Sequence, residues 1–173
     1  MTDPLVLNVA ELTRRPATRK AYELVVPAQG LTLGGDAQVE DGTPVVVDVV
    51  VESLTDGLTV NGEIRTEWRG TCRRCLGPAA GELKAEVSEL YQVHPTSEDA
   101  FTFDGEQLDL GPMVRELVLM ELPPAPLCRP DCAGICPQCG ADRNAAPCDC
   151  GPDLLDPRWA DLEQLRGRLE SEP

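Results

Sequence analysis

Histidine and aromatic residues are scarce in this sequence of 173 residues. It contains one histidine, His94, and two residues each of tryptophan, tyrosine and phenylalanine. His94 precedes a proline in a loop-like stretch, and no acid and nucleophile are arranged around it in the sequence, which argues against a catalytic role. With so few aromatic side chains, the core must rest on valine, leucine and alanine, which favours β-rich packing where valine dominates.

Long hydrophobic runs are also missing. No segment approaches the roughly 18 apolar residues of a membrane-spanning helix, and the N-terminal sequence has no basic stretch followed by an apolar core. We therefore expect a cytoplasmic protein that does not associate with membranes. Structural disulfides are disfavoured in that reducing compartment, so the eight cysteines, which occur in closely spaced pairs, are interpreted as metal ligands.

Positive charge is in short supply. Thirty acidic residues outnumber fifteen basic ones and give a formal charge of −15 at pH 7. This charge opposes general binding to nucleic-acid phosphates, so any RNA contact must be local. The same field favours a basic partner such as a ribosomal protein, although an acidic surface also serves solubility alone.

The common motifs of nucleotide-dependent and hydrolytic enzymes are absent from the sequence. It has no P-loop, dinucleotide fingerprint or nucleophile elbow, and the glycine-rich stretch 30–35 precedes no helical pattern. Neither a general base nor an open metal site is indicated. We therefore expect a protein that is not an enzyme and has no small-molecule substrate.

Alternating hydrophobic residues predict a β-hairpin in the middle of the chain. Within 44–54, Val45, Val47, Val49 and Val51 form a row that would face a core, and Asp56 and Gly57 then provide a tight turn. Alternation resumes over 58–68. A third strand is predicted over 82–93, with a bulge near Glu89, where the phase of the pattern changes.

The start of the chain predicts a strand or strand pair between Leu5 and Val26. Within it lies a basic stretch formed by Arg14, Arg15, Arg19 and Lys20. The segment 27–44 that follows contains turn residues and is expected to connect this part to the hairpin.

One helix is predicted after an exposed acidic loop. Asp109 can cap it, and the consecutive prolines after Leu122 would end it. We therefore expect an α+β fold, with an antiparallel sheet or partly closed barrel and a packed helix. The predicted apolar face of that helix consists of Leu110, Met113, Val114, Leu117 and Met120.

The C-terminal part is rich in cysteine, proline, glycine and aspartate and cannot form a core unaided. We divide the chain into a β-rich main domain, 1–127, and a cysteine-rich zinc-binding module, 128–173. A last helix starting at Asp156 and Pro157 is expected to pack on the main domain. Its apolar stripe is Trp159, Leu162, Leu165 and Leu169.

The eight cysteines form four short pairs, enough for two tetrahedral zinc sites. Zinc takes four thiolate or imidazole ligands, and glycine-rich turns let the two thiolates of a pair converge. The string CPQCG at 136–140 is the most specific motif, and only eight residues separate Cys139 from Cys148, so a local site closes at little entropic cost. The pairs are Cys72 and Cys75, Cys128 and Cys132, Cys136 and Cys139, and Cys148 and Cys150.

By elimination, Cys72 and Cys75 would share an ion with Cys128 and Cys132. A competing assignment joins the four cysteines of 128–139 and leaves Cys72 and Cys75 with the last pair. Redox-active thiols and an iron–sulfur cluster are further alternatives. Zinc held by four sulfurs leaves no position for water, so both predicted sites are structural and not catalytic.

A cluster of arginines surrounds the first cysteine pair. From Trp68 to Ala80 no acidic residue occurs, and these side chains are candidates for contact with RNA or a protein partner. Alternatively, they serve the thiolates and carboxylates of neighbouring strands. The cluster consists of Arg65, Arg69, Arg73 and Arg74.

Several of these segments, taken in order, resemble the YceD family, the large ribosomal RNA subunit accumulation proteins. The resemblance spans Val45 to Leu169 and is most specific in the cysteine regions. It rests on CRRCLGP at 72–78, the helix start at 109–110, ELPPAPLC at 121–128, CAGICPQCGADRN at 132–144, CDC at 148–150 and DPRWADLEQL at 156–165.

The resemblance implies a bacterial protein that acts in accumulation or maturation of large-subunit ribosomal RNA. Together with the residues, it favours a non-enzymatic protein that binds two Zn²⁺ ions and supports ribosome assembly. Its expected partners are a ribosomal protein or a large-subunit assembly intermediate, with local RNA contact. The alternative is a redox-sensing or zinc-handling protein that uses its C-x2-C pairs.

Overall fold

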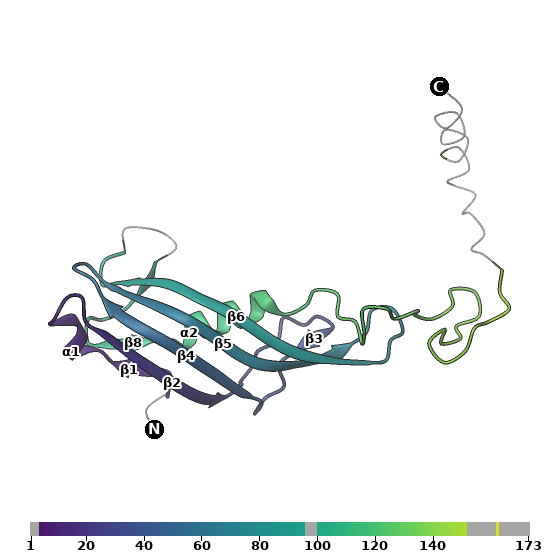
Figure 1. Cartoon of the computed structure of the whole chain (residues 1–173), viewed down its shortest axis with the longest axis horizontal. Coiled ribbons are helices and arrows are strands. Elements are labelled where there is room, and N and C mark those ends of the chain that lie inside the picture. Colours follow the sequence, from purple (N-terminus) through teal and green to yellow (C-terminus); the bar gives the residue numbers. More distant parts are fainter. Residues whose placement is uncertain (1–3, 96–99, 152–161, 163–173) are drawn as a thin grey trace. The chain divides into compact units, whose positions relative to one another are not determined.

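The computed structural model describes residues 4–95, 100–151 and 162, which belong to two units, Met1–Cys132 and Ala133–Pro173. Four long strands form the first unit's main sheet in the order β2, β4, β5, β6 (Figure 1). All four pair antiparallel to their neighbours. They are β2 (Arg19–Pro27), β4 (Pro44–Ser53), β5 (Leu58–Thr71) and β6 (Pro78–Gln92).

Two short strands complete this sheet. β3 (Ala37–Gln38) pairs with β5, and β7 (Phe101–Thr102) pairs in parallel with the end of β6. The order β2-β4-β5-β6-β7 is open in the described part of the chain, so the structure forms a mostly antiparallel sheet there and not a closed barrel. The predicted α+β class is confirmed.

One face of the sheet is buried by smaller elements. β1 (Val6–Asn8) pairs with β8 (Gln107–Asp109), and α1 (Ala10–Thr13) and α2 (Gly111–Glu121) lie beside this pair (Figure 1). Their buried side chains join the valines of β4 in one hydrophobic cluster. Members with no exposed surface include Val47, Val51, Ile64, Leu108 and Met113.

The predicted hairpin of β4 and β5 is confirmed. Its turn is closed by the Leu54 amide, which donates to the Gly57 carbonyl at 2.9 Å. The third strand begins at Pro78, four residues before its predicted start, so the tip between β5 and β6 is short. The predicted bulge near Glu89 is wrong, because β5 and β6 keep one register from Leu58–Tyr91 to Thr71–Pro78.

The predicted helix is present as α2, with two corrections at the level of single residues. Leu110, not Asp109, is the N-cap; the Asp109 carboxylate instead accepts from the Gly111 amide at 2.8 Å. Met120 is 72% exposed, and Val118 takes its expected place in the core with no exposed surface.

The opposite face of the main sheet carries a row of carboxylates in register. Glu23 pairs with Asp48, Asp48 with Glu63, and Glu63 with Glu86, so one acidic residue stands on each of the four long strands. Arg65 and Lys84 both form ion pairs with Glu63. Among the described residues, the other three carboxylates form no ion pair, and like charges directly opposite one another destabilise a sheet.

The described residues of the second unit form a series of turns. Ile135 and Asp142 form an isolated antiparallel bridge, and the Arg143 amide donates to the Gly134 carbonyl at 2.9 Å. The predicted C-terminal helix and its packing lie outside the described residues, apart from Leu162. Within the described parts, no helix combines the length and apolar character needed to span a membrane.

Gly62 marks a close approach between β4 and β5 and yields a stability prediction. A Cβ at this position would overlap the Asp48 carbonyl and lie 2.8 Å from the Val49 Cα atom. Gly62→Ala is therefore expected to lower the free energy of unfolding by about 1–3 kcal/mol, as overpacking does. Chemical denaturation measures the change.

Gly35→Ala provides the matched control. No atom lies within 4 Å of a Cβ built on Gly35, so this substitution should leave the free energy of unfolding within about 0.5 kcal/mol of the wild-type value. Equal effects of the two substitutions would contradict the close approach at Gly62.

Candidate metal centres

The structure gathers the eight cysteines into two groups of four. In each group the sulfur atoms all lie within 4.8 Å of one another, a spacing that could hold a metal ion. We call Cys72, Cys75, Cys128 and Cys132 the hairpin site. The local site consists of Cys136, Cys139, Cys148 and Cys150.

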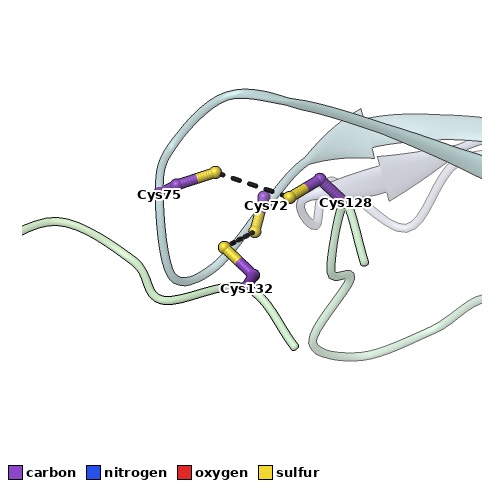
Figure 2. Close-up of side chains that lie close together, drawn as sticks. All are labelled: Cys72, Cys75, Cys128 and Cys132. Carbon is purple, nitrogen blue, oxygen red and sulfur yellow. Dashed lines mark hydrogen bonds between the residues drawn. The ribbon is translucent and has the colours of Figure 1, made fainter. Parts of the chain in front are cut away.

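The hairpin site joins two segments that are far apart in the chain. Cys72 and Cys75 lie on the tip between β5 and β6, and Cys128 and Cys132 follow α2 (Figure 2). Their sulfurs point toward a common centre, with 3.8 Å between Cys72 and Cys132 and 3.7 Å between Cys75 and Cys128.

These sulfur–sulfur distances match a tetrahedral metal site. Four sulfurs placed about 2.3 Å from a central Zn²⁺ ion lie about 3.8 Å apart in a regular tetrahedron. A disulfide would bring two sulfurs to about 2.05 Å, far closer than any contact observed in this site. The donor set therefore fits zinc, whose structural sites commonly consist of four cysteine thiolates.

The same backbone fold supports the first C-x2-C pair of each site. The Cys72 carbonyl accepts from the Leu76 amide, and the Cys136 carbonyl accepts from the Gly140 amide, both at 2.9 Å. Leu76 and Gly140 both have positive φ values, 59° and 72°. In addition, each first cysteine donates its amide to the carbonyl five residues later, at 2.8 Å in both sites.

Backbone amides prepare one thiol of each site for ionisation. Hydrogen bonds from the amides of Cys75 and Cys128 lower the pKa of Cys72 to about 6, against the opposing effect of burial. The amides of Cys139 and Gln138 likewise lower the pKa of Cys136 to about 6. Amides aimed at sulfur stabilise the thiolate, which is the form that binds metal.

In each site, the neighbouring cysteines raise the pKa of another thiol. A hydrogen bond with the Cys132 side chain, together with burial, raises the pKa of Cys128 to about 12, and a hydrogen bond with the Cys139 side chain likewise raises the pKa of Cys150 to about 12. Four thiolates this close repel one another, because each added charge meets the charges already present. A divalent cation at the centre would replace this repulsion with attraction.

The observed grouping is the one that loop length predicts. The structure places Cys72 and Cys75 with Cys128 and Cys132, and it places the other four together. The competing assignment, which joined the four cysteines of 128–139, is contradicted. Cys128 and Cys132 belong to the first unit with the sheet, and the local site lies entirely in the second.

Three of the four predicted contact arginines form ion pairs with carboxylates. Arg65 binds Glu63 at 3.1 Å, and Arg69 binds Glu40 at 3.5 Å. The remaining pair is Arg73 with Asp36, at 2.5 Å.

Arg74 acts within the hairpin site. Its Nη1 atom donates to the carbonyl of Pro130 at 3.1 Å and to that of Cys132 at 3.0 Å, which ties the tip to the segment after α2. The guanidinium thus stabilises the same connection that the thiols make.

Sequence reasoning did not single out the residues that order the local site. The Asn144 side chain accepts from the Ala133 amide at 2.8 Å and donates to the Asp142 carboxylate at 2.7 Å. Aspartate and asparagine side chains commonly bond to nearby backbone in turns, so the string GADRN at 140–144 carried a recognisable signal.

The part of the chain that carries the cysteines matches a known protein family. The family model described as "Large ribosomal RNA subunit accumulation protein YceD" matches residues 60–166, which include all eight cysteines. The chain belongs to the YceD family. The resemblance seen in the sequence is confirmed, and the family's description gives a role in accumulation of large-subunit ribosomal RNA.

Relatives of this YceD-family chain occur in bacteria and plants. The uncharacterized protein Rv2926c of Mycobacterium tuberculosis is 33% identical over 177 residues, which cover 96% of this chain and 84% of that protein. The large ribosomal RNA subunit accumulation protein YCED homolog 1, chloroplastic, of Arabidopsis thaliana is 29% identical, covering 83% of this chain and 55% of that protein. No solved structure matches the chain.

Double substitutions distinguish the two groupings by metal count. Cys72→Ser with Cys128→Ser removes two ligands of the hairpin site and none of the local site. Native mass spectrometry of the protein loaded with Zn²⁺ should therefore show one ion. Under the competing grouping, the same variant would damage both sites and show none.

The reciprocal variant, Cys72→Ser with Cys148→Ser, serves as the control. It removes one ligand from each observed site, so no fully coordinated ion should remain, whereas the competing grouping would leave one site intact. The wild-type protein should hold two ions.

Loss of the hairpin site should destabilise the sheet more than loss of the local site. A metal between Cys75 and Cys128, which are 53 residues apart, constrains the unfolded chain as a long cross-link does, at about 2–4 kcal/mol. In the presence of Zn²⁺, Cys72→Ser should thus lower the midpoint of thermal unfolding monitored by circular dichroism. Cys136→Ser should leave this sheet transition unchanged, and an equal shift in both variants would refute the assignment.

Proposed function

We propose that this protein supports accumulation of large-subunit ribosomal RNA as a zinc-stabilised binding protein without catalytic activity. The observation that carries the proposal is the pair of closed four-sulfur groups in a member of the YceD family. The family description supports the ribosomal role, and the sulfur geometry supports zinc.

The ligand sets argue for structural metal and against metal-dependent catalysis. An ion bound by four cysteine thiolates has no position left for water or substrate, whereas catalytic zinc keeps one position open. Both groups supply four sulfurs, and Cys72, Cys132 and Cys136 are buried. The proposed role of the metal is therefore to hold the hairpin tip and the C-terminal turns in shape.

The row of carboxylates on the exposed sheet face supports a basic protein partner. Glu23, Asp48 and Glu86 are exposed and face like-charged neighbours across the strands. A cationic segment laid across this row would relieve the repulsion, and opposite charge would speed its approach. We therefore propose that the partner is a ribosomal protein or a large-subunit assembly intermediate in the bacterial cytoplasm.

Depletion of the protein tests the role in RNA accumulation. In the bacterium that carries this gene, depletion should lower the ratio of large-subunit to small-subunit ribosomal RNA. A copy encoding the wild-type chain should restore that ratio. An unchanged ratio of large-subunit to small-subunit ribosomal RNA in depleted cells would contradict the proposed function.

The row of carboxylates, which is the proposed partner surface, is tested with one variant and one matched control. Glu23→Gln with Glu86→Gln removes two charges from the row, and Glu116→Gln with Glu121→Gln removes two from exposed positions on α2. The sheet-face variant should capture at least fivefold less large-subunit ribosomal protein from lysate than the α2 variant. Equal capture by the two variants would contradict the proposed surface.

A further inference from the structure

Basic side chains with no carboxylate partner among the described residues lie in the loop between α1 and β2 and at the start of β2. Arg14 and Arg15 are exposed and form no ion pair within the described residues. The Lys20 Nζ atom lies over the Tyr22 ring, 5.0 Å from its centroid, and no carboxylate partner occurs for it in the described chain. Three cations are therefore available here, in contrast to Arg65 and Arg69 of β5 and Arg73 of the hairpin tip, which form ion pairs.

These cations surround a pocket of about 360 Å³. A pocket of this size can take a group as large as a nucleotide, since small-molecule sites begin at about 300 Å³. Arg19 also lines the pocket and is paired with Glu52 at 3.0 Å, and one carboxylate, that of Glu11, is part of the lining. Arg14, Arg15, Lys20, Thr18 and Tyr22 also line it.

The backbone that carries the arginines is fixed to β4. The Ala17 amide donates to the Ser53 carbonyl at 2.8 Å, and the Ser53 amide donates to the Thr18 carbonyl at 2.9 Å. The Thr18 hydroxyl in turn donates to the Arg15 carbonyl at 2.6 Å. Ala17 has a φ of 62°, an unfavourable conformation for alanine that these bonds hold in place. The loop is therefore ordered before any ligand arrives, which lowers the cost of binding.

The pocket cations lie apart from the acidic row of the sheet. Lys20 is three residues along β2 from Glu23, the nearest member of the row, which corresponds to about 10 Å at the rise of a strand, and the two side chains point to opposite faces of the sheet. Because exposed charges are screened over about 8 Å at physiological ionic strength, the carboxylate row does not cancel the pocket's field. A chain with a charge of −15 can therefore present a local positive site.

We propose that this pocket binds the phosphate backbone of RNA, with Arg14, Arg15 and Lys20 as the contacting cations. This inference rests on the proposed function, for which it supplies the RNA-contacting surface. Guanidinium groups match phosphate geometry and bind it through paired hydrogen bonds, and the ammonium of Lys20 adds a point charge. Contacts of this kind position a protein on RNA without reading the base sequence.

The experiment compares two triple variants of the full chain that change the formal charge equally. The pocket variant is Arg14→Gln, Arg15→Gln and Lys20→Gln, and the control is Arg65→Gln, Arg69→Gln and Arg73→Gln at the ion-paired positions. Fluorescence anisotropy measures the Kd for a labelled transcript of large-subunit ribosomal RNA over a range of salt concentrations. Circular dichroism verifies that both variants are folded.

The pocket variant should bind the transcript at least tenfold more weakly than the wild type. The slope of log Kd against log salt should fall by about 2, since each lost contact to a single-stranded phosphate contributes about 0.7. The control should bind within about twofold of the wild type.

Four results would overturn the inference: no binding by the wild-type chain at 100 mM salt, wild-type affinity of the pocket variant, an equal loss in the control, or displacement of the RNA by equimolar inorganic phosphate. The last result would indicate a site for a small anion. Failure here is separable from failure of the proposed function, because that function is judged by the ribosomal RNA ratio in depleted cells.

Discussion

The convergence of four thiols from two distant segments is the constraint on which the end of the sheet depends. β5 and β6 extend to the tip that carries Cys72, where the buried cluster of the described residues consists of Cys72, Ala79 and Cys132, with Trp68, Cys75 and Leu127 packed against it. So small an apolar cluster contributes little burial energy, and four close thiolates would repel one another. A divalent cation bound there would resolve both difficulties, because it would turn the sulfurs into a cross-link where the core is too small to serve as one.

The two candidate metal centres share the same backbone hydrogen bonds around their first C-x2-C pair but lie in different structural contexts. The same two backbone bonds recur around Cys72, at the tip of a hairpin, and around Cys136, in a turn-rich segment. What differs is the second pair of thiols. At the local site that pair follows within the same turn-rich segment, so closure costs little chain entropy, whereas the hairpin site must wait until β5, β6 and α2 have brought Cys128 near the tip.

Features that depend on the hydrophobic period of a segment or on the length of a loop could be predicted from the sequence. The alternation of β4 and β5 identified the buried row, and the short separation of Cys139 from Cys148 identified the local site, from which the hairpin site followed by elimination. The face of α2 could not be fully assigned, because Met120 and Val118 lie about 80° to either side of Leu110 at about 100° per residue. Only the position of the sheet decides between them, and it buries Val118. The supposed bulge near Glu89 failed for a similar reason: the end of β6 pairs with both β5 and β7, so Tyr91 and Gln92 are both buried without an inserted residue.

The uneven distribution of charge explains how a strongly acidic chain could contact ribosomal RNA. Along β5, the position level with Arg19 is twelve residues from Thr71 at the hairpin tip, a distance of about 40 Å at the rise of a strand. Arg69 and Arg73 pair with carboxylates of their own unit, and the sheet face between the two ends keeps its excess of acid. Arg14, Arg15 and Lys20 form no ion pair within the described residues. With screening over about 8 Å, these surfaces act independently. A basic protein and an RNA phosphate chain would thus be held on separate surfaces of one sheet, and neither would have to displace the other.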